Sequence, residues 1–105
     1  MFLFSKKNNN AIKVNEIKDY LGKISLIDIR EPFEYSAGHI PTAKNIPMNT
    51  LINNPEKYLD KSKEYYIVCQ SGGRSSSTCN FLSKQGFNIV NVSGGTGSYT
   101  GKLEY

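Results

Sequence analysis

Apolar residues along this chain fall into short runs that predict strands of a buried sheet. The clearest is the uninterrupted run Tyr65 to Val68, which is typical of a strand covered on both faces. Leu26 to Ile29, interrupted by Asp28, is rich in residues that favour strands and predicts a second one. Ile89 to Val92 predicts a third strand, and Ala11 to Val14 predicts a short edge strand.

Helical spacing of apolar residues appears between these strands. A first helix is predicted after Asn15, its N-cap, and a second over Phe33 to Ser36, which follows Pro32. Short helices are predicted within Asn49 to Asp60, separated near Pro55. The last is predicted over Ser75 to Gln85, with Gly86 at its C-cap. Because strands and helices alternate, the pattern predicts an α/β fold. We expect one three-layer domain, with a mainly parallel sheet of four to five strands and helices on both faces.

The domain is predicted to span residues 11–105, behind a flexible lead of residues 1–10. Ser5 to Asn10 is polar and has no periodicity, whereas a chain of 105 residues suits a single core. The longest apolar run, Tyr65 to Cys69, is far shorter than the roughly 20 residues that cross a bilayer. Met1 to Phe4 is also too short for the core of a signal peptide. We therefore expect no membrane contact and a cytoplasmic location.

Charge and composition narrow the classes of partner. The net charge is +4, but the lysines are scattered, whereas a nucleic-acid-binding surface normally clusters them. The charge instead favours small anionic substrates. With two cysteines, one histidine and no Cys-x-x-Cys motif, the chain has too few ligands for a zinc site. We expect no nucleic acid and no metal site.

Polar residues and glycines follow three of the predicted strands. They are Asp28 with Arg30, the segment from Cys69 to Arg74, and Gly94 with Gly95. In a parallel sheet, ligands bind beyond the carboxyl ends of the strands. These three segments therefore predict the position of the functional site.

A cysteine at the end of a strand, followed by a glycine-containing loop and a helix, indicates an activated thiol. Gly72 and Gly73 allow unusual backbone dihedrals, so that loop amides can turn inward around an anion. The amino end of the helix near Ser75 faces the same place, and Arg74 adds a permanent positive charge. All of these favour a thiolate, so we expect Cys69 to be largely ionised at neutral pH.

At these residues the sequence resembles the rhodanese-like family of single-domain sulfurtransferases. The matching segments, in family order, are Leu26 to Tyr35, Gly38 to Pro47, Cys69 to Ser75, Gly86 to Phe87, and Gly94 to Gly95. The resemblance implies that Cys69 takes the outer sulfur of a small anionic donor, thiosulfate or a persulfide, and becomes a persulfide. A thiol or a protein cysteine then accepts that sulfur, and this mechanism calls for no cofactor.

The resemblance also implies roles for the neighbouring residues. The backbone amides of Gln70, Ser71, Gly72, Gly73 and Ser75 would surround the persulfide. Arg74 would act with Cys69 by stabilising the anionic donor. Asp28 should be paired, because an isolated buried charge is costly, and Arg30 and the loop amides are the candidate partners. Such a pair would brace the loop; the alternative is that Arg30 lines the mouth of the pocket.

Three further positions receive other interpretations. Cys79 shares a predicted helical face with Leu82 and is expected in the core, with a resolving cysteine as the alternative. His39 is expected to support the fold rather than catalysis. After Gly95 the chain lacks the family's usual apolar residue and tryptophan, having Thr96 and Tyr99 instead, which leaves the last helix open.

Two alternatives remain beside the sulfurtransferase. A phosphatase or arsenate reductase of related fold also uses a cysteine and an arginine around an anion loop. Four residues separate Cys69 from Arg74 here, one fewer than in the cell-cycle phosphatases that this loop resembles. The second alternative is a partner-dependent sulfur relay or a non-catalytic binding module.

Overall fold

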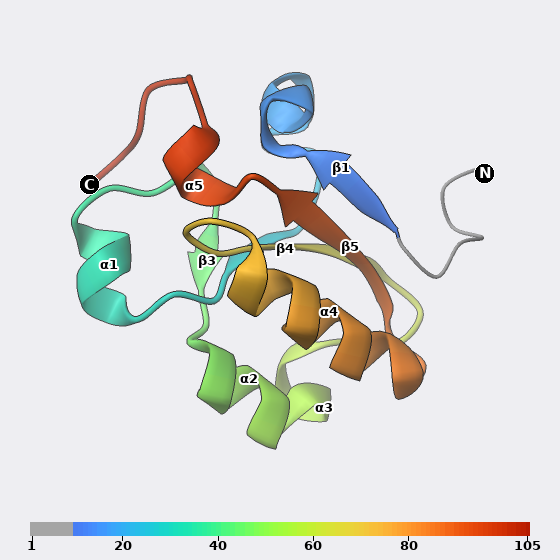
Figure 1. Ribbon diagram of the computed structural model, residues 1–105. Helices are drawn as coiled ribbons and strands as arrows, with labels where there is room; N and C mark the ends of the chain where they lie inside the picture. The colour runs from blue at the N-terminus through green and yellow to red at the C-terminus, as the bar shows by residue number, and fades with distance from the viewer. Residues whose placement is uncertain (1–9) are drawn as a thin grey trace.

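A computed structural model describes residues 10–105, so the predicted flexible lead lies outside the described residues except for Asn10. Five parallel strands form one sheet in the order β1-β5-β4-β2-β3 (Figure 1). They are β1 (Ala11–Lys13), β2 (Leu26–Asp28), β3 (Lys44–Asn45), β4 (Glu64–Val68) and β5 (Asn88–Ser93). The prediction of a parallel sheet within an α/β domain is confirmed.

Helical segments connect successive strands, and one more follows the last strand. They are the 3-10 helix η2 (Val14–Tyr20) and the α-helices α1 (Pro32–Ser36), α2 (Met48–Asn53), α3 (Pro55–Tyr58), α4 (Gly73–Lys84) and α5 (Gly95–Ser98). None of the helices in residues 10–105 is both long enough and apolar enough to cross a bilayer.

Each face of the sheet carries its own apolar core, because successive side chains of a strand point to opposite faces. Tyr65 and Ile67 of β4 pack with residues of α2 and α4, such as Leu51 and Leu82. Val68 belongs to the other core, which η2 and the segments around α1 and α5 cover. The expectation of helices on both faces is therefore met, and the ends of β2, β4 and β5 lie at one edge of the sheet.

The helix after the central strand begins earlier than its apolar pattern predicts. We expected it to start at Ser75, whereas α4 begins at Gly73. Gly72 has a left-handed φ of +110°, which turns the chain sharply enough for Gly73 and Arg74 to join the first helical turn. The amino end of α4 is thus placed directly against the end of β4.

The first helical segment also differs from the prediction. Val14–Tyr20 forms a 3-10 helix, and Asn15 lies inside it rather than at its N-cap. The Asn15 side chain instead donates to the Ser98 carbonyl and accepts from the Thr100 amide. These bonds to the C-terminal segment replace the local capping bond that the sequence pattern suggested.

Candidate active site

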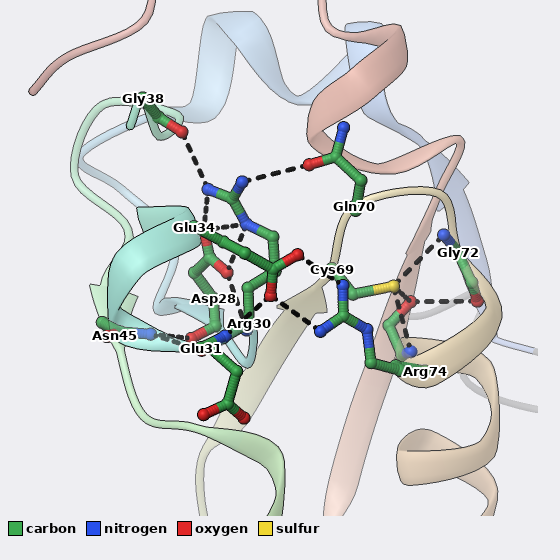
Figure 2. A network of polar contacts seen from close by, with 11 residues as sticks. Asp28, Arg30, Glu31, Glu34, Gly38, Asn45, Cys69, Gln70, Gly72 and Arg74 are labelled. Atoms are coloured by element: carbon green, nitrogen blue, oxygen red, sulfur yellow. Dashed lines mark hydrogen bonds and ion pairs between the residues drawn. The ribbon is translucent and has the colours of Figure 1, made fainter. Parts of the chain in front are cut away.

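Cys69 is the residue directly after β4, at the carboxyl end of the central part of the sheet (Figure 2). It is buried, with 1% of its surface exposed, and its side chain packs on the same face as α4. The loop from Gln70 to Gly72 then returns the chain to the start of α4. Strand end, loop and helix start therefore converge on one sulfur atom.

Backbone amides surround this sulfur. The Gly72 amide donates to Cys69 Sγ at 3.1 Å, and the Ser75 amide donates at 3.3 Å. The Ser75 hydroxyl lies 3.4 Å from Sγ and 3.2 Å from the Gly72 carbonyl oxygen. A hydroxyl proton can rotate between these two neighbours, so Ser75 can accept from a thiol or donate to a thiolate.

Two opposing effects set the pKa of Cys69. Burial raises it, but hydrogen bonds from the Ser75 hydroxyl and from the amides of Ser75, Gly72 and Ser71 together lower it below the ordinary value of a cysteine. The helix dipole acts in the same direction, because Sγ faces the amino end of α4. The geometry thus favours the thiolate, the form in which a cysteine is nucleophilic.

Arg74 forms an ion pair with Glu34 of α1, a residue that the sequence analysis did not single out. Arg74 Nη1 and Nη2 donate to the two carboxylate oxygens of Glu34 at 2.8 and 2.9 Å (Figure 2). The hydrogen bond from Arg74 is the main cause that lowers the pKa of Glu34, to about 2. Glu34 in turn raises the pKa of Arg74, and the nearby Cys69 thiolate adds to this. Arg74 is therefore close to the thiolate, but its charge is already paired.

A second ion pair, which is buried, contacts the side chain of a loop residue. Arg30 is bound to both carboxylate oxygens of Asp28, and the side chains of the two residues are 4% and 0% exposed. Arg30 also donates to the Gly38 carbonyl at 2.8 Å and to Gln70 Oε1 at 3.1 Å. Asp28 is thus paired as its burial required, and Arg30 links the end of β2 to the side chain of the loop residue Gln70.

The segment after β5 holds the other side of the loop. The Thr96 amide donates to the Cys69 carbonyl, and the Gly97 amide donates to the Gln70 carbonyl, both at 2.9 Å. This approach requires Gly95, because a Cβ atom there would lie 2.4 Å from the Gln70 carbonyl oxygen and its φ is +69°. The last helix, which the sequence left open, is the single turn α5, and its backbone contacts the loop.

Cys79 lies in the core, as the sequence analysis expected, and His39 packs on Tyr35 of α1. Cys79 is buried in the core beside α4, and burial, followed by the charge of Cys69, raises its pKa to about 12. His39 stacks on Tyr35 with 3.7 Å between ring centroids, and its Nδ1 lies 2.9 Å from the Tyr35 carbonyl oxygen. In the described part of the chain, no three His, Cys, Asp or Glu side chains are grouped as a metal site would need.

The structure brings some of the predicted site residues to the sulfur and places others around them. Ser71, Gly72 and Ser75 reach Cys69 Sγ through their amides. The Gln70 side chain turns away to Arg30, and Gly73 begins α4. Glu34 was missed because its partner is 40 residues away in the sequence.

A signal for Glu34 did exist in the sequence. It lies in the first turn of a helix that follows a strand end, at the same edge of the sheet as the Cys69 loop. An acidic residue at this position can form an ion pair with the arginine of the loop.

Comparison with known proteins agrees with this geometry. The sequence model of the Rhodanese-like domain family matches residues 13–102. "Putative sulfurtransferase YtwF" of Bacillus subtilis is 45% identical over 84 residues, which cover 78% of this chain and 79% of that protein.

Two solved structures from staphylococci have the same fold. SSP1007 of Staphylococcus saprophyticus superimposes with a TM-score of 0.80 at 36% identity, covering 91% of this chain and 99% of that one. A rhodanese-like domain protein of Staphylococcus aureus gives 0.77 at 36% identity, covering 90% of this chain and 96% of that one. From its sequence match and its fold, the chain belongs to the rhodanese-like domain family.

Proposed function

We propose that the protein is a sulfurtransferase of the thiosulfate sulfurtransferase type, which carries sulfur as a persulfide on Cys69. The observation that carries this proposal is the set of backbone amides that point at Cys69 Sγ from the loop and from the first turn of α4. The same donors that stabilise a thiolate also suit the terminal sulfur of a persulfide, which is an anion. The relative YtwF, named as a sulfurtransferase, supports the same chemistry.

The reaction has two steps that balance in atoms and electrons. The Cys69 thiolate attacks the outer sulfur of thiosulfate; the new S–S bond forms as the old one breaks, and sulfite leaves with its electron pair. A thiolate acceptor, a small thiol or a protein cysteine, then attacks the outer sulfur of the Cys69 persulfide. This step releases the Cys69 thiolate and gives the acceptor as a persulfide.

The other site residues have supporting roles in this proposal. The amides of Gln70, Ser71, Gly72, Gly73 and Ser75 line the loop that surrounds the outer sulfur. Asp28 and Arg30 brace that loop through Gln70. Arg74, paired with Glu34, lies close to the thiolate. We assign it the side of the site at which the anionic donor arrives. We place the reaction in the cytoplasm, where thiols stay reduced.

Thiocyanate formation tests the proposal. Purified protein is given thiosulfate and cyanide, and thiocyanate is measured for wild type, Cys69→Ala and Cys79→Ser. We expect turnover by wild type and Cys79→Ser and none by Cys69→Ala. Turnover that survives in Cys69→Ala would contradict the assignment of the nucleophile.

A phosphatase is the second outcome of the same experiment. An aryl phosphate is offered to the same variants, and hydrolysis that needs Cys69, without thiocyanate, would replace the sulfurtransferase by a phosphatase. Sulfur transfer is the first candidate, because the loop between Cys69 and Arg74 is one residue shorter than in the cell-cycle phosphatases that it resembles.

A further inference from the structure

An ion pair with Glu34 holds the guanidinium group of the loop residue Arg74. Both guanidinium Nη atoms of Arg74 are engaged, at 2.8 and 2.9 Å, by the two oxygens of one carboxylate. The Glu34 carboxylate is also held from its own helix, because the Glu31 backbone amide donates to Glu34 Oε1 at 2.9 Å. The carboxylate is thus held in place from two sides.

The other arginine near the loop is neutralised in the same way. Arg30 is paired with the buried carboxylate of Asp28, so that each arginine beside Cys69 has its own counter-charge. The backbone amides at the amino end of α4 add a partial positive charge that faces the sulfur. That partial charge suits one negative charge at the sulfur, whereas a second negative charge on the donor finds no free cation among the paired arginines.

We propose that Glu34 is a specificity-determining residue: by neutralising Arg74, it favours sulfane-sulfur donors with one negative charge, such as organic persulfides, over dianionic thiosulfate. This inference rests on the proposed function, since it concerns the donor of the same Cys69 persulfide. It assigns to the loop a preference that neither the cysteine nor the loop sequence alone would give.

The effect is a fixed property of the site under working conditions. The hydrogen bond from Arg74 keeps the pKa of Glu34 at about 2, so the carboxylate stays charged at any pH at which the enzyme would work. Only a substitution can remove its charge. Glu34→Gln is the best choice, because its amide oxygen can still accept from the Glu31 amide while the negative charge is gone.

The size of the effect follows from Coulomb's law. We assume a donor charge about 7 Å from the Glu34 carboxylate in a water-like medium. Repulsion by the carboxylate then lowers the association constant of the donor about threefold for one negative charge and about sevenfold for two. Removing Glu34 should therefore help a dianion more than a monoanion. The difference is largest at low ionic strength, where screening is weak.

Two donors that differ by one charge provide the test. Thiosulfate is a dianion that releases sulfite, and methanethiosulfonate is a monoanion that releases methanesulfinate. In both cases the Cys69 thiolate takes the outer sulfur, and the electron pair of the broken S–S bond leaves with the sulfur oxyanion. Cyanide removes the sulfur from Cys69 as thiocyanate, so both reactions have the same readout.

The experiment compares kcat/KM for the two donors in wild type, Glu34→Gln and Glu31→Gln. Glu31→Gln is the matched control, because this substitution also removes one negative charge from the same end of α1. The Glu31 carboxylate forms no ion pair within residues 10–105 and points away from Arg74 in Figure 2. Any general loss of activity on substitution cancels in the ratio of the two donors.

We expect Glu34→Gln to raise the ratio of kcat/KM for thiosulfate to that for methanethiosulfonate about threefold, and Glu31→Gln to leave it near the wild-type value. An unchanged or lower ratio in Glu34→Gln, while wild type turns over both donors, overturns the role of Glu34 and leaves the sulfurtransferase intact. An equal rise in Glu31→Gln also overturns it, because the effect would then be one of general charge. Absence of thiocyanate from both donors in wild type overturns the proposed function and this inference with it.

Discussion

Removing the Ser75 hydroxyl tests whether hydrogen bonds overcome burial at Cys69. Ser75 contacts Sγ twice, through its amide at 3.3 Å and through its hydroxyl at 3.4 Å. Ser75→Ala deletes the hydroxyl and leaves the amide, the loop and the helix start in place. Burial, which opposes ionisation, is unchanged, so the pKa of Cys69 should rise.

The expected magnitude follows from the geometry. A hydrogen bond to a charged group contributes about 1.5–3 kcal/mol. The lower end applies here, because the hydroxyl must give up the Gly72 carbonyl, 3.2 Å away, in order to donate to the thiolate. A loss of about 1.4 kcal/mol corresponds to a tenfold smaller thiolate fraction at a pH below the pKa.

Alkylation by iodoacetamide measures this fraction, because only the thiolate reacts. The rate is followed against pH in a Cys79→Ser background, although the pKa of Cys79, about 12, already keeps that thiol unreactive near neutral pH. We expect the midpoint to move to higher pH in Ser75→Ala, with roughly tenfold slower alkylation below it. Ser76→Ala, an exposed serine one position along α4, is the control and should match wild type. A midpoint that stays in place, or that falls, would refute the balance of burial and hydrogen bonding described for Cys69.

Three further predictions concern stability. Asp28→Asn should lower the free energy of unfolding by about 3–5 kcal/mol in urea titrations, because it leaves the buried Arg30 without its counter-charge; a loss below 1 kcal/mol would contradict this. Gly95→Ala should cost at least about 2 kcal/mol and also reduce turnover, since its Cβ would overlap the Gln70 carbonyl, and an unchanged melting temperature would be the contrary result. Glu34→Gln should cost about 1 kcal/mol at pH 7. Because folding lowers the pKa of Glu34 from 4.5 to about 2, this difference should be complete above pH 4.5 and vanish as the pH falls toward 2; a difference independent of pH would argue against the ion pair.

The sequence was informative where the structural cause is local. The apolar run before Cys69 indicated a strand covered on both faces, and the glycines after it indicated a tight loop, because both signals lie within a few residues of each other. The pairing of Asp28 was also accessible, since a carboxylate in an apolar strand needs a partner and Arg30 is two residues away. Chemistry and neighbours were adjacent in the sequence in each of these cases.

What the sequence did not reveal depends on contacts between distant segments. The position of Glu34 in the sequence makes it a candidate partner, but the residues near Arg74 do not identify it, because the whole fold brings these two side chains together. The 3-10 form of the segment around Asn15 has the same origin, since its side chain bonds to the C-terminal segment more than 80 residues away. Local propensity was overridden there by tertiary hydrogen bonds.

The proposed function requires that Cys69 gain one sulfur atom from its donor, and intact-mass spectrometry detects this gain directly. Wild type, Cys69→Ala and Cys79→Ser are incubated with thiosulfate and separated from the excess donor. The intact mass of each protein is then measured before and after addition of cyanide. We expect wild type and Cys79→Ser to gain the mass of one sulfur atom and to lose it to cyanide, while Cys69→Ala gains nothing. Sulfur gained by Cys69→Ala, or none gained by wild type from either thiosulfate or methanethiosulfonate, would contradict it.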